Sequence, residues 1–266
     1  MINMNEIIGQ QDIVFITFDT LRYDVAQAAF LAGELPNLQS VLPQTGWDLR
    51  HSPGSFTYAA HQAFFAGFLP TPARPGQHER RFAARFAGSE TTGSGTFVFD
   101  APDLVSGLAA QGYHTICIGG VGFFNRQTPL SCIFPDLFAE SHWQEEMGVT
   151  DPNSPRHQFE LAAARLHLLP QNQRTFLFIN LSALHQPNHY YLPDSPEKTD
   201  NLESHRAALH YIDSQFPLLW EAQKRRGSSF NIYCSDHGTA YGEAGFTGHR
   251  LAHPTVWNVP YAEFLL

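Results

Sequence analysis

Four apolar runs constrain the fold of this chain more than any other feature. None of them alternates between polar and apolar residues, and together they are rich in Ile, Phe and Thr. Continuous apolar runs of this kind are typical of strands that are buried on both faces of a parallel sheet. The runs are DIVFITF (12–18), YHTICIGG (113–120), TFLFINLS (175–182) and FNIYCS (230–235).

Helical patterns separate these runs. Residues 101–113, 157–170 and 201–227 carry apolar residues at helical spacing, and Pro217 is expected to kink or split the last of these helices. Strands that alternate with helices predict an α/β fold, with a doubly wound, mostly parallel sheet and helices on both faces. The chain of 266 residues has no linker long enough to separate domains, so we expect a single domain over residues 1–266.

Composition excludes several classes of partner. The formal net charge is −9 and no basic stripe is present, which argues against a nucleic-acid partner. No apolar stretch approaches the roughly 18 residues that a membrane span needs, and the polar, acidic N-terminus does not resemble a signal peptide. Three cysteines without an obvious pairing predict a reducing compartment, so we expect a cytoplasmic protein.

Side chains of the metal-binding type follow three of the four apolar runs. Asp19 follows the first run, His185 and His189 follow the third, and Asp236 and His237 follow the fourth. Sites in open α/β sheets form outside the carboxyl ends of the strands, so these side chains are expected to meet. Taken alone, Asp19 could equally be a helix cap. Three such strand ends together favour a metal site.

The segment HSPGSFTYAAHQAFFAGFLP (51–70) is a second candidate feature. A turn is followed by a predicted short helix that ends at Gly67, which places Ser55 or Thr57 at or near the helix N-terminus. Free backbone N–H groups and the helix dipole favour an anion there. The hydroxyl is either an ordinary helix cap or a nucleophile aimed at an anionic ester, and a nucleophile would need activation by a base or a metal ion.

Four segments, in this order, resemble motifs of the alkaline phosphatase superfamily. They are IVFITFDTLRYD, SFTYAAHQAFFAGFLP, ALHQPNHYY and SDHGTAYGEAGFTGH, and the resemblance covers almost the whole chain. The closest likeness is to the sulfatase-like branch, which includes sulfatases, phosphonate monoester hydrolases, phosphoethanolamine transferases and lipoteichoic acid synthases. The resemblance implies an alkaline-phosphatase-like core.

The resemblance also implies a metal site with a nucleophile. Asp19, Asp236, His237 and the Oγ of Thr57 would hold a divalent ion, and Thr57 would be the nucleophile. Mixed oxygen and nitrogen ligands favour Zn²⁺ and leave Mn²⁺ open, whereas Mg²⁺ and Ca²⁺ suit the histidine less well.

Histidines complete the implied site. His185 and His249 would bind the non-bridging oxygens of the substrate or protonate the leaving group. His185, His189 and His249 could instead form a second metal site, for which His253 is a weaker candidate.

The chain departs from the sulfatase pattern in informative ways. Sulfatases use Cys-x-Pro-Ser-Arg, whose Cys or Ser becomes formylglycine, whereas residues 57–61 here read Thr-Tyr-Ala-Ala-His; Thr20 stands where sulfatases have a second Asp. A threonine nucleophile is similar to that of phosphoethanolamine transferases and lipoteichoic acid synthases, which carry membrane segments. The chain ends with NVPYAEFLL, so we expect it to lack the small C-terminal subdomain of sulfatases. The pocket would then be open or closed by a partner subunit, for example in a homo-oligomer.

These observations predict a metal-dependent hydrolase of phosphate (di)esters or phosphonate esters that acts through Thr57 and a covalent intermediate. A small anionic ester is the expected partner. The alternatives are a sulfate-ester hydrolase, a soluble phosphoryl transferase and a non-catalytic ligand-binding protein. The segments 71–100 and 125–155 are expected to line the pocket, with Phe123, Phe124 and Trp143 as its aromatic residues.

Several further residues have structural interpretations. Arg22 is expected to pair with Asp24 or to cap the end of the sheet, and Glu243 is expected to lie in a turn or to support a ligand rather than bind metal itself. The polar, proline-rich segments 71–80 and 185–201 are predicted loops.

Overall fold

The computed structural model describes residues 2–67, 71–86, 92–192 and 198–266. These residues form one eight-stranded sheet, with the strand order β3-β2-β12-β9-β1-β8-β6-β7. Its strands are β1 (Asp12–Phe18), β2 (Asp48–His51), β3 (Thr71–Pro72), β6 (His114–Ile118), β7 (Glu140–His142), β8 (Thr175–Leu181), β9 (Ser229–Ser235) and β12 (Asn258–Leu265). Two small sheets pair β4 (Phe82–Ala84) with β5 (Phe97–Phe99), and β10 (Ala240–Tyr241) with β11 (Thr247–Gly248).

The centre of the large sheet is parallel. β1 pairs in parallel with β8 and β9, and β6 pairs in parallel with β8 and β7. β12 runs antiparallel to both β9 and β2. All four apolar runs are strands, namely β1, β6, β8 and β9, so the predicted mostly parallel sheet is confirmed.

The sheet also contains strands that the sequence pattern does not reveal. β12 lies between β9 and β2 although Pro260 and Glu263 interrupt its apolar character. β2, β3 and β7 have four residues or fewer, which is too short for a periodic signal. These strands depend on pairing with the central sheet rather than on their own sequence.

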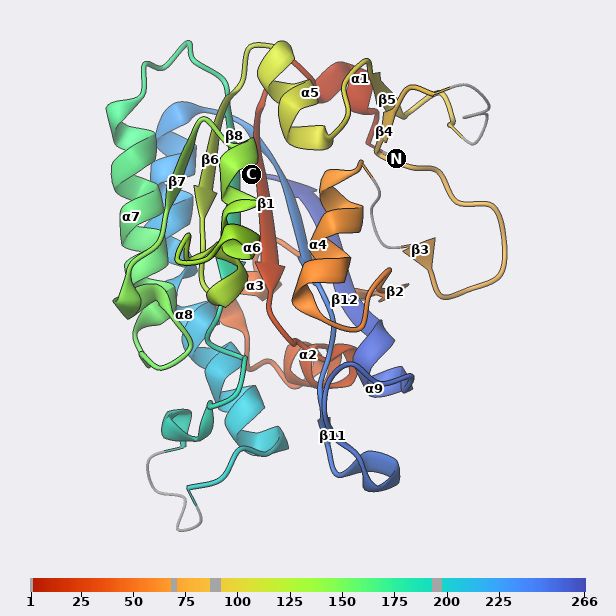
Figure 1. Ribbon diagram of the computed structural model, residues 1–266, viewed down its shortest axis with the longest axis vertical. Coiled ribbons are helices and arrows are strands. Elements are labelled where there is room, and N and C mark those ends of the chain that lie inside the picture. The colour runs from red at the N-terminus through yellow and green to blue at the C-terminus, as the bar shows by residue number, and fades with distance from the viewer. Residues whose placement is uncertain (1, 68–70, 87–91, 193–197) are drawn as a thin grey trace.

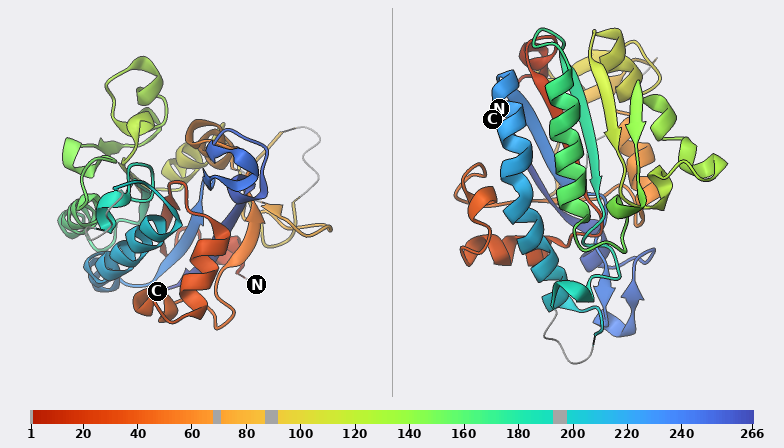
Figure 2. Two further views of the ribbon diagram at one scale, coloured as in Figure 1. Left: turned by 90° about the horizontal axis from the view of Figure 1, so that it is seen from below. Right: turned by 90° about the vertical axis from the view of Figure 1, so that its left-hand side faces the viewer.

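Helices cover both faces of the sheet, as predicted (Figures 1 and 2). Side chains alternate across β1: Val14, Ile16 and Phe18 belong to one core cluster, and Ile13 and Phe15 belong to the other. The first cluster includes residues of α2 (Tyr23–Leu31), α3 (Pro36–Gln39), α7 (Ser154–Leu168) and α8 (Leu202–Arg226). The second includes residues of α1 (Met4–Ile7), α4 (Thr57–Phe65) and α5 (Leu104–Ala110). The remaining helices are α6 (Pro129–Cys132) and α9 (Pro254–Trp257).

The predicted helices are present, with one correction. The predictions for 101–113, 157–170 and 201–227 correspond to α5, α7 and α8. α8 continues through Pro217, so the expectation of a split there is wrong. Phe216 and Leu219, on either side of the proline, are fully buried in the core, and this packing outweighs the loss of one backbone hydrogen bond.

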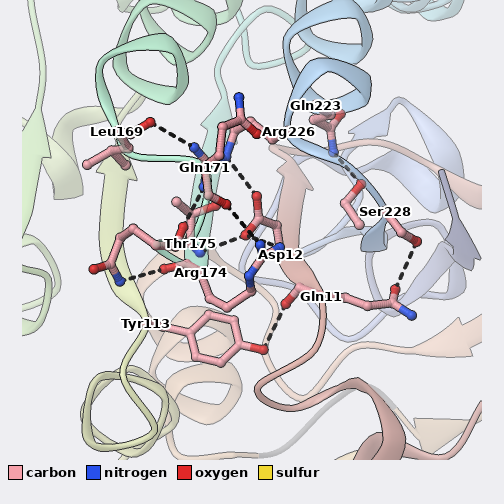
Figure 3. Close-up of polar contacts among 12 residues, drawn as sticks. Gln11, Asp12, Tyr113, Leu169, Gln171, Arg174, Thr175, Gln223, Arg226 and Ser228 are labelled. Carbon is pink, nitrogen blue, oxygen red and sulfur yellow. Dashed lines mark hydrogen bonds and ion pairs between the residues drawn. The ribbon is translucent and has the colours of Figure 1, made fainter.

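The amino end of β1 is fixed by a buried ionic network (Figure 3). Asp12 is 5% exposed, and its Oδ2 accepts a hydrogen bond from Arg226 Nε at 2.8 Å. Its Oδ1 accepts from the backbone N–H of Thr175 at 2.9 Å and from Arg174 Nη1 at 3.4 Å. The network joins β1, β8 and the end of α8 at the edge of the sheet opposite the carboxyl ends of the parallel strands.

Among the described residues, no helix has both the length and the apolar character needed to cross a bilayer. The predicted loop 185–201 contains the short 3₁₀ turn His189–Tyr191, and its residues 193–197 lie outside the described part of the chain.

Candidate active site

The carboxyl ends of β1 and β9 bring three predicted metal ligands together. The strands are parallel neighbours with Phe18 paired to Ser235, so the residues that follow them, Asp19 and Asp236, leave the sheet side by side. One ligand atom each from Asp19, Asp236 and His237 lies within 4.8 Å of the other two, and all three side chains are fully buried. Distant segments of the sequence therefore meet as predicted.

Thr57 joins this group at the start of α4. Its Oγ1 lies 3.2 Å from Asp19 Oδ2 and 3.3 Å from His237 Nε2. The helix cap is Phe56 and no side chain caps α4, so the capping interpretation of Ser55 or Thr57 is excluded. Asp19 is not a cap either, because Arg22 occupies the N-cap position of α2. Neither Thr57 nor Asp19 therefore acts as the helix cap that the sequence allowed.

The three ligand candidates fit a divalent cation. Asp19 Oδ1 and Asp236 Oδ2 are buried without a hydrogen-bond partner. His237 Nδ1 donates to the carbonyl of Gly238 at 2.9 Å, which leaves the Nε2 lone pair directed at Thr57. Burial raises the pKa of Asp19 to about 6 and that of Asp236 to about 7, and the neighbouring Asp236 carboxylate also contributes to the shift of Asp19.

A chain of buried hydrogen bonds supports Thr57 from behind. Asn180 Nδ2 donates to Thr17 Oγ1 at 3.3 Å, and Thr17 Oγ1 lies 2.9 Å from His61 Nε2. His61 Nδ1 donates to the carbonyl of Thr57 at 2.7 Å, so the hydroxyl of Thr17 donates to Nε2. Burial lowers the pKa of His61 to about 3, which keeps this ring neutral. His61 thus fixes the backbone of Thr57.

The structure brings two of the remaining histidines to the site. The ring centroids of His185 and His249 lie 5.8 Å apart, and those of His237 and His249 lie 4.7 Å apart. Burial, together with the nearby His237 and His185, lowers the pKa of His249 to about 3. His189 instead lies 3.3 Å from Asp200 Oδ1. His253 caps α9. Within the described ranges, His185, His189 and His249 do not approach one another as closely as the first ligand set, and the second metal site stays a prediction.

A cavity of about 450 Å³ opens beside Thr57, and its walls come from α4, the segment 121–149 and the residues around His185 and His249. Its lining residues are Thr57, Val121, Gly122, Phe123, Thr128, Leu130, Ser131, Val149, His185, His249 and Arg250.

The predicted pocket segments are only partly correct. Segment 125–155 contributes as expected, but the described residues of 71–100 do not line this cavity, because β4 and β5 lie near α1 and α5 at the far end of the molecule (Figure 1). Phe123 lines the cavity. Phe124 is instead buried in the core, and Trp143 donates its indole N–H to the carbonyl of Gly120.

Arg250 is a cavity residue that the sequence analysis did not single out. It has a positive φ of 67°, an uncommon conformation outside glycine, and its backbone N–H donates to the carbonyl of Ser55 at 2.9 Å. Its guanidinium carbon lies 5.6 Å from the ring centroid of Phe56. The signal available in the sequence was only its position directly after His249.

A second buried network links the loops that carry the histidines. Tyr241 Oη accepts a hydrogen bond from Asn188 Nδ2 at 2.9 Å and lies 3.1 Å from His205 Nδ1. Glu243 accepts from the backbone N–H of Tyr241 at 2.6 Å and pairs with Arg22. The segment after β8 is thereby joined to the β10–β11 hairpin that precedes His249. Arg22 also pairs with Asp24, as predicted.

Comparisons with known proteins agree with this geometry. The family model described as Sulfatase matches residues 11–262, so the chain belongs to the sulfatase family. No curated protein sequence matched the chain.

Solved structures share the fold at low sequence identity. The C-terminal periplasmic domain of phosphoethanolamine transferase EptC from Campylobacter jejuni is similar with a TM-score of 0.63 and 16% identity, over 96% of this chain and 79% of that one. The corresponding EcEptC domain from Escherichia coli, in complex with Zn, is similar with a TM-score of 0.59 and 14% identity, over 96% of this chain and 72% of that one. Lipoteichoic acid synthase LtaP from Listeria monocytogenes is similar with a TM-score of 0.56 and 12% identity, over 96% of this chain and 65% of that one. These likenesses show that the predicted alkaline-phosphatase-like fold is correct.

Proposed function

We propose that this protein is a metal-dependent hydrolase of phosphate diesters or phosphonate esters, with Thr57 as its nucleophile. The observation that carries the proposal is the position of the Thr57 hydroxyl. It lies 3.2 Å from Asp19 and 3.3 Å from His237, beside a cavity, with two buried carboxylate oxygens nearby that have no partner. A small anionic ester is the partner that this arrangement suits.

Asp19, Asp236, His237 and Thr57 are the proposed ligands of a single divalent ion. We favour Zn²⁺ because the set mixes carboxylate oxygens with an imidazole nitrogen, and a relative of the same fold is known as a Zn complex. When bound, the ion would lower the pKa of the Thr57 hydroxyl and neutralise charge on the phosphoryl group.

The side chains around the cavity have separate roles in the proposed reaction. Thr57 Oγ gives up its proton to solvent and forms a bond to phosphorus, while the bond between phosphorus and the leaving oxygen breaks on the opposite side. His249, whose lowered pKa keeps it neutral, donates a ring N–H to a non-bridging oxygen. His185, which lines the same cavity, protonates the leaving oxygen. Water then cleaves the bond between Thr57 and phosphorus, which restores the hydroxyl.

Phosphorus rather than sulfur is favoured by residue 57 itself. A threonine cannot be converted to the formylglycine that sulfatases use, so sulfate-ester hydrolysis is the alternative. Transfer of a phosphoryl group to an acceptor alcohol is a second alternative, and the names of the solved phosphoethanolamine transferases support it.

The three cysteines are free and two are buried, which supports the proposed reducing, cytoplasmic location.

The decisive measurement is hydrolysis of bis(p-nitrophenyl) phosphate by Zn²⁺-loaded protein, with p-nitrophenyl sulfate alongside. We expect diester turnover that Thr57→Ala lowers about a thousandfold or more and Thr57→Ser partly retains. Ser55→Ala, two residues earlier, is the matched control and keeps wild-type turnover. Turnover of the sulfate ester alone, or diester turnover that survives Thr57→Ala, contradicts the proposal.

A further inference from the structure

One wall of the cavity beside Thr57 is apolar and packs against α4. Val121, Phe123, Leu130 and Val149 form this wall. Phe123 packs against Tyr58, with ring centroids 5.5 Å apart, so the wall is held by the residue directly after the nucleophile. In turn, Tyr58 packs on Phe134 at 4.7 Å.

The hydroxyl groups of the polar residues in this wall already form hydrogen bonds within the protein. Thr128 and Ser131 form a reciprocal capping box at the start of α6. The Ser131 N–H donates to Thr128 Oγ1 at 3.2 Å, and the Thr128 N–H donates to Ser131 Oγ at 2.9 Å. Because these hydroxyls serve the helix, the wall offers a ligand mainly apolar surface. The capping box also fixes Leu130, which is 49% exposed at the cavity.

Arg250 supplies a positive charge to the same cavity. No ion pair joins it to a carboxylate among the residues that the structure describes, in a chain whose net charge is −9. Arg250 lines the same cavity as Thr57 and His249. An arginine with a strained backbone and no acidic partner, next to a nucleophile, suits an anionic group of a ligand.

We infer that the site selects esters with an apolar, ring-sized substituent. That substituent lies along Val121, Phe123, Leu130 and Val149 while Arg250 pairs with the anionic phosphoryl or phosphonyl head. Arg250 and Leu130 are thus specificity-determining residues. This inference rests on the proposed function for the location of the reacting group, but it concerns binding and can be measured without turnover.

The test compares methylphosphonate with phenylphosphonate, which carry the same anionic head and a carbon–phosphorus bond that the proposed reaction does not cleave. Binding to Zn²⁺-loaded protein is measured by calorimetry. We expect phenylphosphonate to bind roughly tenfold more tightly, as burial of one face of a ring predicts. Leu130→Ser removes most of this difference and leaves methylphosphonate binding unchanged. Arg250→Gln weakens both compounds by a similar factor, roughly tenfold.

Ile133→Ser is the matched control for Leu130→Ser. Ile133 is also 49% exposed and directly follows α6, but it does not line the cavity. Equal binding of the two phosphonates, no binding of either, or the same loss in Ile133→Ser as in Leu130→Ser overturns the inference. If the wild-type protein showed no Thr57-dependent turnover but still bound phenylphosphonate more tightly than methylphosphonate, the proposed function would be contradicted and the inference would stand.

Discussion

Asp19 and Asp236 are two buried carboxyl groups whose negative charge is unfavourable for stability. Each has a side-chain oxygen that is buried without a hydrogen-bond partner, and burial raises the pKa of both carboxyl groups. Uncompensated buried charge is costly in the absence of a cation. The metal-free protein should therefore be less stable than a variant in which one of these charges is removed.

Asp236→Asn tests this expectation through pH. The substituted amide would retain an oxygen that accepts from the N–H groups of Thr20 and His237. The folded pKa of Asp236 is about 7, above the roughly 3.9 of an unfolded aspartate. Between these values the folded state binds more protons, so wild-type stability falls as pH rises from about 4 to 7. We expect the stability advantage of Asp236→Asn over wild type to grow across this window in urea titrations with chelator present. Parallel pH curves contradict the prediction.

The same substitution should abolish the stabilising effect of metal. At about pH 7.5 we expect excess Zn²⁺ to raise the melting temperature of wild-type protein, because a ligand that binds the folded state stabilises it by mass action. Asp236→Asn should lose most of this shift. Equal shifts in both proteins would show that Asp236 is not a ligand.

Gly238 is required by a close approach of two backbone segments. A Cβ atom at this position would lie 1.9 Å from the carbonyl oxygen of Thr255. The Gly238 N–H also donates to the carbonyl of Val256 at 2.7 Å, so the two segments cannot separate freely. We expect Gly238→Ala to lower the free energy of unfolding by about 1–3 kcal/mol, the usual cost of overpacking. Gly122→Ala, where the nearest atom would lie 3.9 Å from the new Cβ, is the control in denaturant titrations.

At the scale of elements, the site depends on hydrogen bonds between loops rather than on the strands alone. β1, β8 and β9 place the ends of three segments at one edge of the sheet. The relative position of His185 and His249 then depends on the contact between Asn188 and Tyr241, which joins the segment after β8 to the β10–β11 hairpin. Tyr241 is thus a positioning residue, whose hydrogen bonds go to Asn188, His205 and Glu243 rather than to the proposed metal ligands.

Tyr241→Phe should loosen this connection without unfolding the protein. The ring remains, but the hydrogen bonds to Asn188 and His205 are lost. We expect diester turnover to fall about three- to tenfold through kcat, since small displacements of catalytic groups are costly, while Zn²⁺ affinity stays within about twofold of wild type. Tyr211→Phe, which removes the exposed hydrogen bond to Asn153, is the control. Unchanged kcat in Tyr241→Phe would show that the hairpin is held by other contacts.

At the scale of the whole molecule, a buried ionic network and the candidate site lie at opposite edges of the sheet. Asp12, Arg174 and Arg226 form the ionic network at the amino ends of the parallel strands, and the candidate site lies at their carboxyl ends (Figures 1 and 3). The two edges share the central strands but no polar contact described above. Changes at the ionic network should therefore alter stability without altering metal affinity.

Arg226→Gln tests this separation. It leaves the buried carboxylate of Asp12 without its closest ionic partner, so we expect the free energy of unfolding to fall by about 3 kcal/mol or more. The Zn²⁺ affinity of the folded fraction should be unchanged. Arg225→Gln, at a neighbouring arginine that is 72% exposed, should cost less than about 0.5 kcal/mol. Equal losses in the two variants contradict the assignment.

Much of this architecture follows from local pattern. The strands β1, β6, β8 and β9 are long apolar runs whose burial on two faces can be recognised from composition, and the major helices have a clear apolar period. Since parallel strands end at one edge of a sheet, the approach of Asp19 to Asp236 and His237 also follows from the order of elements.

Other features arise only when the chain is folded. β12 is a strand because β9 and β2 lie on either side of it, despite its proline. Arg250 faces the cavity because its left-handed backbone and its contact with Ser55 place it there. Tyr241 meets Asn188 across 53 residues of sequence. Each of these depends on contacts between residues far apart in the sequence, which no local pattern displays. The apolar runs of β1, β6, β8 and β9 and the apolar spacing of the long helices are local patterns, so they can be read from the sequence.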